Sequence, residues 1–415
     1  MDNRFIIDTM ENRDYMYKNA VSLLDFGRRF ASPYGSSYYL GDNGMPMIEH
    51  PRETWITSRM AHVYSIGKML GIKGCDELAD RAIEGLLTEL HDNKNGGWYS
   101  GITADGHTLP DKMCYAHAFV ILAATSALLA DIKGAKDLLY DSLNIFDRYF
   151  WDEEEGLTLD SWDMSFTEPD EYRGLNANMH TVEAFLAVSD ATGDETYRKR
   201  AGRIIDRVIT WAKENDYRLP EHFDSEWVPQ PDLNWDNPDD PFKPYGATPG
   251  HGMEWARLII QYARSIQKRN AEANGINEYI SAAKSLYDRA YNDAWNIDGF
   301  PGFVYTTDFE GRPVINDRMH WTLAEAINTS AVLYRVTGEE KYADDFSKYL
   351  EYMDSDVIDH RYGSWFHQLD KENNVIDTVW PGKPDIYHAF QAMLIPYLDV
   401  SVSVASGNAD LSRTF

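Results

Sequence analysis

Apolar and polar residues recur along most of the chain with the period of an α-helix, and the predicted helices alternate between two kinds. One kind is amphipathic and rich in charges, as expected of a helix with one side in water. The other kind is apolar on nearly every side, which predicts burial. The charged helices are predicted at residues 15–31, 74–91, 133–149, 194–213, 277–295 and 339–353. The apolar helices are predicted at residues 54–70, 111–129, 176–190, 250–266, 318–336 and 385–398.

This alternation gives six helix pairs at a spacing of about 55 to 75 residues, which indicates a repeat architecture. Links from an apolar helix to the next charged helix are very short, as at residues 71–73 and 192–193. Links in the other direction span about 18–35 residues and contain Gly-rich aromatic stretches that predict short hairpins. In a ring of antiparallel helix pairs, all the long links fall on one face. The pattern therefore predicts an all-α (α/α)6 barrel, a single domain over residues 1–415, with the site at its long-loop mouth.

The apolar helices share a histidine near their start, at positions that would converge on the axis of such a barrel. The six histidines are His62, His117, His180, His251, His320 and His388. The last helix follows a Pro/Gly-rich stretch that begins at Trp380, and Asp385 is its expected N-cap. A single histidine in a buried helix is more often a core residue, but the recurrence of the pattern favours a pocket.

Bulk composition narrows the function further. A net charge of −28 argues against nucleic-acid binding, because phosphate contacts need clustered Lys and Arg. Cys75 and Cys114 are the only cysteines, too few for a disulfide framework, which indicates a reducing compartment. Residues 1–30 lack the apolar core of a signal peptide, and no apolar run approaches the roughly 18 residues of a membrane span. We expect a soluble, cytoplasmic protein without a membrane or nucleic-acid partner.

Several polar residues of the apolar helices are candidates for binding or catalysis. Arg59 shares a helical face with Trp55, and a buried arginine suits either a ligand oxygen or a carboxylate partner. Tyr115 and Asn176 suit hydrogen bonds to hydroxyls, or to neighbouring backbone groups. His180 with Glu183, and His251 with Glu254, form pairs three residues apart. A carboxylate in such a pair would hold the imidazole in one tautomer and prepare it for proton transfer near neutral pH.

Other chemistries have weaker support. The zincin motif His-Glu-x-x-His is absent, although histidines from different helices would still be able to gather around a metal. The Gly-x-Ser-x-Gly motif and the Gly-rich dinucleotide and phosphate loops are also missing. Glycoside hydrolysis by two carboxylates is the main rival. The repeated central positions carry His rather than Asp, which favours moving a proton on carbon or on a sugar hydroxyl.

Four stretches of the chain resemble one known family. They are Thr54-Trp55-Ile-Thr-Ser-Arg59-Met, Asn176-Ala-Asn-Met-His180-Thr-Val-Glu183, Thr248-Pro-Gly-His251-Gly-Met-Glu254-Trp255 and Trp380-Pro-Gly-Lys-Pro-Asp-Ile-Tyr-His388. Together they resemble the N-acylglucosamine 2-epimerase family over about residues 15–400, and within it the bacterial aldose–ketose isomerases that act on mannose or sulfoquinovose.

The resemblance implies an (α/α)6 barrel and proton transfer between C1 and C2 of an open-chain sugar, without a metal or other cofactor. His251 and His388 would form the acid/base pair, and Arg59 would bind the oxygens on the carbonyl side. The other implied pocket residues are His180, Glu254, Trp55, Tyr115, Asn176, Trp321, Trp380 and Asp385.

We therefore expect an isomerase that interconverts D-mannose and D-fructose, with D-lyxose and D-xylulose as a second pair. In this hypothesis His388 shuttles the proton between C2 and C1, and His251, oriented by Glu254, assists ring opening. The two histidine roles are interchangeable at this level. A 2-epimerase or sulfoquinovose isomerase of the same family stays open, as does a glycoside hydrolase or a non-catalytic sugar-binding barrel. The sequence leaves the oligomeric state open.

Overall fold

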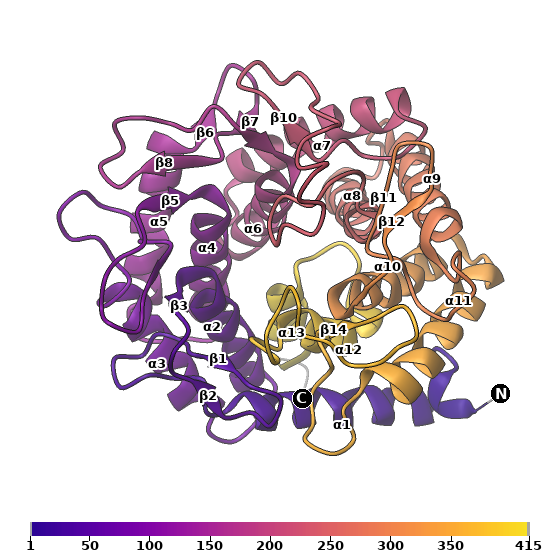
Figure 1. The fold of residues 1–415 in the computed structure, drawn as a ribbon, viewed down its shortest axis with the longest axis horizontal. Helices are drawn as coiled ribbons and strands as arrows, with labels where there is room; N and C mark the ends of the chain where they lie inside the picture. Colours follow the sequence, from indigo (N-terminus) through magenta and orange to yellow (C-terminus); the bar gives the residue numbers. More distant parts are fainter. Residues whose placement is uncertain (1, 413–415) are drawn as a thin grey trace.

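A computed structural model describes residues 2–412, and its helices form two concentric rings (Figure 1). The inner ring closes through contacts between successive helices and between the last and the first. Its members are α2 (Thr54–Met69), α4 (Cys114–Leu129), α6 (Leu175–Thr192), α8 (Pro249–Arg269), α10 (His320–Thr337) and α12 (Tyr387–Leu394). The outer ring consists of α1 (Met10–Gly27), α3 (Cys75–Leu87), α5 (Ala135–Tyr149), α7 (Glu195–Glu214), α9 (Ile276–Ala294) and α11 (Glu340–Tyr352).

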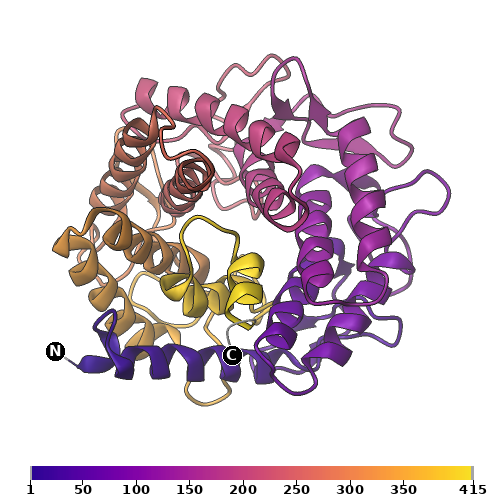
Figure 2. The same cartoon turned by 180° about the vertical axis from the view of Figure 1, so that it is seen from behind.

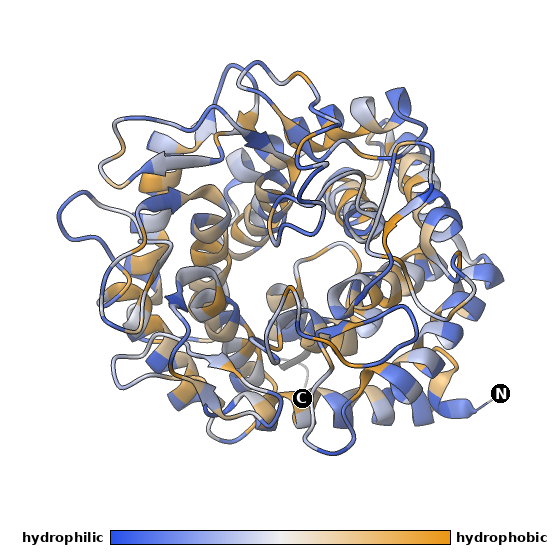
Figure 3. Ribbon diagram, in the orientation of Figure 1, coloured by the Kyte–Doolittle hydropathy of each residue, from blue (hydrophilic) through white to orange (hydrophobic). Residues whose placement is uncertain are grey.

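Burial follows the two kinds of helix that the sequence pattern distinguishes. In α4 every residue from Cys114 to Ala127 is buried, because this helix packs against α2, α5 and α6. In α5 only one face is buried, with Leu138 and Phe146 directed inward while its charges reach water. The coloured ribbon shows the same division, with hydrophilic residues concentrated on the outer ring and in the loops (Figure 3). The predicted (α/α)6 barrel is confirmed.

Short antiparallel strand pairs occupy the long links. Three pairs are local hairpins: β1 (Tyr39–Leu40) with β2 (Pro46–Met47), β6 (Trp151–Asp152) with β7 (Leu157–Thr158), and β11 (Thr306–Thr307) with β12 (Pro313–Ile315). Four pairs join the strand before an inner helix to the next long link: β3 (Arg52–Glu53) with β4 (Gly101–Ile102), β5 (Asp111–Met113) with β8 (Ser161–Asp163), β9 (Arg173–Gly174) with β10 (His222–Phe223), and β13 (Arg318–Met319) with β14 (Gln368–Leu369). These second pairs tie successive repeats together.

The strand pairs also explain where the predicted helix starts are wrong. Residues 111–113 and 318–319, expected at the start of two inner helices, are the strands β5 and β13, whose backbone groups pair with neighbouring links. The last inner helix starts at Tyr387, and Asp385 accepts a hydrogen bond from its backbone N–H at 2.7 Å. Pro396 follows within the 3-10 turn Ile395–Tyr397, so this helix is shorter than the predicted 385–398.

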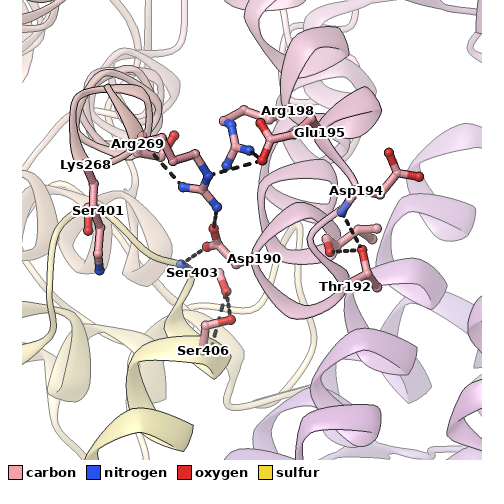
Figure 4. A network of polar contacts seen from close by, with 12 residues as sticks. Asp190, Thr192, Asp194, Glu195, Arg198, Lys268, Arg269, Ser401, Ser403 and Ser406 are labelled. Carbon is pink, nitrogen blue, oxygen red and sulfur yellow. Dashed lines mark hydrogen bonds and ion pairs between the residues drawn. The ribbon is translucent and has the colours of Figure 1, made fainter. Parts of the chain in front are cut away.

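A C-terminal helix that the periodicity did not predict, α13 (Val404–Ser412), lies in the centre of the ring seen from behind (Figure 2). It contacts α2, α4 and α6. Asp190, near the end of α6, accepts a hydrogen bond from the Ser403 N–H at 2.7 Å and pairs with Arg269 at 3.4 Å (Figure 4). Arg269 also bonds Glu195 at 3.2 Å. This network fastens the C-terminal segment to the barrel end opposite the mouth. Within residues 2–412, no helix combines the length and apolar character needed to cross a bilayer.

Candidate functional site

A cavity of about 690 Å³, including its open entrance, lies at the N-terminal ends of the inner helices. All eleven residues proposed from the sequence border it: Trp55, Arg59, Tyr115, Asn176, His180, His251, Glu254, Trp321, Trp380, Asp385 and His388. The remaining lining residues are Pro241, Phe242, Pro244, Tyr305, His320, His367 and Pro384.

Arg59 is buried in the wall of this cavity and is fixed from several sides. Its Nη1 donates to Asp385 Oδ2 at 3.0 Å, and its Nη2 donates to the Tyr115 hydroxyl at 2.9 Å. The guanidinium carbon lies 4.7 Å from the Trp55 ring centroid, a cation–π distance. Burial raises the pKa of Tyr115 to about 12, so its hydroxyl keeps its proton and can donate it to a ligand. Arg59 therefore pairs with a carboxylate and also borders the cavity, where it can bind a ligand oxygen.

His388 is held between a carboxylate and the Arg59 guanidinium. Its Nδ1 lies 3.1 Å from Glu325 Oε1, so Nδ1–H donates and Nε2 is left facing Arg59 Nη2 at 3.5 Å. Arg257 Nε in turn donates to Glu325 Oε2 at 2.8 Å. Burial opposes ionisation of Glu325, but Arg257 and His388 outweigh it and bring the pKa of Glu325 to about 2. Burial and then Arg59 lower the pKa of His388, although Glu325 opposes the shift. His388 is thus an oriented, neutral base.

His251 is oriented by a carboxylate other than the predicted one. Its Nδ1 lies 2.9 Å from Glu221 Oε2, and Glu221 comes from the link that enters β10. Glu254 instead accepts a hydrogen bond from Arg257 Nη2 at 3.3 Å. The prediction that Glu254 orients His251 is therefore wrong, because the guanidinium one helical turn further along α8 takes that carboxylate. Burial, reinforced by Glu325, raises the pKa of Glu254 well above its usual value.

Trp321 lies between the two candidate acid/base histidines. Its ring centroid is 5.0 Å from that of His251 and 6.0 Å from that of His388. Both imidazoles therefore flank one indole and border the same cavity. An apolar ring of this size suits the apolar face of a sugar, with polar groups left for its hydroxyls.

The predicted pair of His180 and Glu183 forms within α6, at 3.3 Å between Nδ1 and Oε2. The Tyr387 hydroxyl also donates to Glu183. Burial lowers the pKa of His180 to about 4, which keeps its imidazole neutral near pH 7. His180 is therefore suited to a hydrogen bond with a ligand hydroxyl rather than to an ion pair.

Two of the six recurrent histidines do not reach the cavity. His62 Nδ1 lies 2.7 Å from Ser126 Oγ, between α2 and α4. His117 accepts a hydrogen bond from the Trp98 N–H at 3.1 Å through Nε2 and donates to the Met113 carbonyl through Nδ1. His62 and His117 are therefore hydrogen-bonded core residues. The expectation that all six histidines converge on the barrel axis is wrong.

Some residues that line the cavity or orient its side chains were not proposed from the sequence. Glu325 and Arg257 had a detectable signal, because each is a charged residue in a helix that the sequence predicts to be buried. Glu221, His367 and Phe242 lie in long links, where no periodicity points to them. Phe242 borders the cavity, with its ring centroid 5.6 Å from that of Trp380.

Buried carboxylates and imidazoles also offer two places where ligand atoms for a metal lie within 4.8 Å of one another. One group is His180, Glu183 and Glu254, and the other is Glu254, Glu325 and His388. Arg257 already lies against Glu254 and Glu325. A second cation at the latter group would have to displace a buried guanidinium, so the donor set suits a proton-transfer network better than a metal centre.

The fold and the cavity define a carbohydrate-converting (α/α)6 barrel, since aromatic walls suit sugar faces and oriented imidazoles suit proton transfer. Residues 35–392 match the N-acylglucosamine 2-epimerase (GlcNAc 2-epimerase) family, and the chain belongs to that family. A D-mannose isomerase from Pseudomonas cannabina pv. alisalensis is 41% identical, over 90% of this chain and 89% of that protein. A D-mannose isomerase from Thermobifida fusca is 38% identical, over 96% of this chain and 97% of that protein. A crystal structure of a D-mannose isomerase matches with a TM-score of 0.85 and 26% identity, covering 92% of this chain and 97% of that one.

Proposed function

We propose that the protein is an aldose–ketose isomerase that interconverts D-mannose and D-fructose. The observation that carries this proposal is the 41% identity over 90% of the chain to a D-mannose isomerase. The site geometry supports it, because His388 and Arg59 are neighbours in one cavity. His251 lies beside Trp321 in the wall of the same cavity. D-Lyxose and D-xylulose, which have the same configuration around the reacting carbons, are the second expected pair.

The proposed proton carrier is His388. A hydrogen next to an aldehyde becomes acidic only if the developing enediolate is stabilised, and the Arg59 guanidinium supplies that charge beside His388 Nε2. His388 takes the C2 proton as a neutral base, and the C2–H electron pair forms the C1–C2 double bond of the enediolate. The O2 proton then passes to O1, and return of the first proton to C1 gives the ketose. General base catalysis of this kind contributes about 10²–10⁴ in rate.

His251 and Glu254 act on the sugar oxygens in this proposal. Glu221 holds the Nδ1–H of His251, which leaves Nε2 to exchange a proton with the ring oxygen or the C1 hydroxyl during ring opening. Burial and Glu325 raise the pKa of Glu254, which favours the protonated carboxyl, and in that form Glu254 can donate a hydrogen bond to a sugar oxygen. Tyr115, also protonated, can do the same on the Arg59 side.

The cavity is better matched to a neutral sugar than to sulfoquinovose. Among the described residues that line it, Arg59 is the only Lys or Arg, and its charge is paired with Asp385 at 3.0 Å. A sulfonate would bring a negative charge without a free cation to receive it, and an unpaired buried charge is costly. Turnover of sulfoquinovose in preference to mannose would contradict this reading.

Incubation of the protein with D-mannose in deuterium oxide, followed by NMR, tests the proposal. We expect D-fructose with deuterium at C1, or with hydrogen carried over from C2 by internal transfer, and equal rates with and without a chelator. Glucose without fructose would identify a 2-epimerase, since the same enediolate is then reprotonated at C2 from the opposite face. Reducing ends released from a disaccharide would instead indicate a glycoside hydrolase, and sugar binding without any turnover would indicate a binding barrel.

A further inference from the structure

A second pair of histidines borders the cavity next to the proposed proton carrier. His320 and His367 are stacked, with ring centroids 3.7 Å apart and planes inclined by 22°. His320 opens α10 and His367 immediately precedes β14, so the pairing of β13 with β14 places them side by side. The His320 backbone N–H donates to the His367 carbonyl at 3.1 Å. The His320 ring centroid lies 6.3 Å from that of His388.

Hydrogen bonds to carbonyl oxygens assign the tautomer of both rings, because a carbonyl can only accept. His320 Nδ1 lies 3.4 Å from the His367 carbonyl oxygen, so Nδ1 carries the proton and Nε2 carries a lone pair. His367 Nε2 lies 3.1 Å from the Asp385 carbonyl oxygen, so there Nε2 carries the proton and Nδ1 the lone pair. Burial and the neighbouring imidazoles lower the pKa of His320 well below its usual value, and burial lowers that of His367 to about 4. Both rings are therefore neutral.

The lone pair of His320 has no hydrogen-bond partner among the described residues. His320 is 7% exposed, and its Nε2 is a buried atom that nothing in the protein satisfies. Buried polar atoms are almost always paired, so an orphan acceptor at a cavity wall points to a ligand that donates a hydrogen bond. An ionised carboxylate has no proton to give. A hydroxyl of a neutral sugar does.

We propose that His320 is a specificity-determining residue that accepts a hydrogen bond through Nε2 from the hydroxyl on carbon 3, 4 or 6 of the sugar. His367 is its positioning residue, because the stack and the carbonyl contact fix the ring and its tautomer. This assignment rests on the proposed sugar isomerase function. It complements the donors on the opposite side of His388, where Arg59 and Tyr115 face the reacting oxygens.

Deoxy sugars paired with His320 variants test the assignment. Wild type is compared with His320→Phe, which keeps the ring shape without an acceptor, on D-mannose and its 3-, 4- and 6-deoxy analogues. We expect kcat/KM for mannose to fall roughly 10- to 100-fold in H320F, as befits one lost hydrogen bond in a buried site. The deoxy sugar that lacks the bound hydroxyl should be turned over equally by both proteins. An equal loss on every sugar, or no loss on mannose, overturns the assignment.

His320→Gln is the matched control, because its side-chain oxygen can reach the position of Nε2 and keep an acceptor there. H320Q should recover discrimination against the same deoxy sugar, which a purely structural role of the imidazole would not restore. Thermal unfolding of each variant checks that it folds. If H320F does not fold, then H320Q is compared with wild type on the same sugars. Should wild type convert no mannose, the isomerase proposal fails separately. The binding of D-mannitol, measured by calorimetry, then tests the role of His320. The proposal requires D-mannitol to bind H320F more weakly than wild type and H320Q.

Discussion

Glu325 and His388, which are 63 positions apart in the chain, meet at 3.1 Å between Oε1 and Nδ1 in the buried interior. Arg257 holds the other Glu325 oxygen at 2.8 Å. The carboxylate therefore does for His388 what an aspartate or glutamate does for many catalytic imidazoles: it fixes the tautomer and strengthens the base. Removing its charge should affect the proton-transfer step more than sugar binding.

The Glu325→Gln variant should accordingly lower kcat about 100-fold while KM for mannose changes little, because general base catalysis is weakened and the cavity wall keeps its shape. The measurement is steady-state kinetics together with exchange of the C2 hydrogen with solvent deuterium. Glu325→Asp serves as control and should retain more exchange than E325Q. A large rise in KM with unchanged kcat would show that Glu325 acts through binding instead.

Two glutamates near His251 should respond differently to the same substitution. Glu221→Gln replaces the acceptor at 2.9 Å from Nδ1 by an amide that can present its N–H to the ring, so we expect kcat/KM to fall roughly 10- to 100-fold. Burial raises the pKa of Glu254 and favours its protonated form, so Glu254→Gln keeps a hydrogen-bond donor and should be milder than Glu254→Ala. The check is kcat/KM for all three variants on mannose. Equal loss in E254Q and E254A would contradict the proposed donor role.

The pH dependence of the reaction follows from the environment of His388. Burial and Arg59 lower its pKa below the usual 6.5, so the base stays neutral until the pH drops below that value. We therefore expect the acidic limb of kcat/KM to be centred below pH 6.5, because protonation of His388 removes the base and occurs only at lower pH than for an ordinary histidine. A pH–rate profile on mannose measures it. An acidic limb centred above pH 7 would mean that His388 is not the base in the free enzyme.

A loop that forms part of the cavity wall is anchored by His222. Its Nε2 donates to the Pro244 carbonyl at 2.7 Å, and Tyr172 donates its hydroxyl to Nδ1 at 2.8 Å. Pro244 borders the cavity together with Phe242. His222→Phe keeps the ring volume and loses the donor, so we expect KM for mannose to rise roughly 3- to 10-fold, in line with one lost hydrogen bond.

The value of kcat should stay within about twofold in this variant, because one lost loop contact leaves the bond between Glu221 and His251 in place. Tyr172→Phe is the companion variant and should move KM in the same direction by less. If H222F instead lowers kcat about 10-fold or more, then His222 shares the role of the adjacent Glu221, and an effect confined to KM is ruled out.

Hydrophobic periodicity alone determined the barrel, because the inner and outer helices have different solvent exposure and therefore different residue patterns. The short links at one end and long links at the other determined which face carries the mouth. Local spacing also placed Arg59 on one face with Trp55 and paired His180 with Glu183, since residues three or four apart on a helix are neighbours whatever the surrounding fold.

Tertiary structure alone decided which carboxylate serves which histidine. The spacing of His251 and Glu254 suggested a pair, yet Arg257 takes Glu254, and Glu221 reaches His251 from 30 residues away. The stack of His320 on His367 likewise depends on the pairing of β13 with β14. Neighbours on the same helix and residues from other repeats compete for each buried side chain, and only the tertiary arrangement decides which of them pairs, because a buried polar group left without a partner is costly.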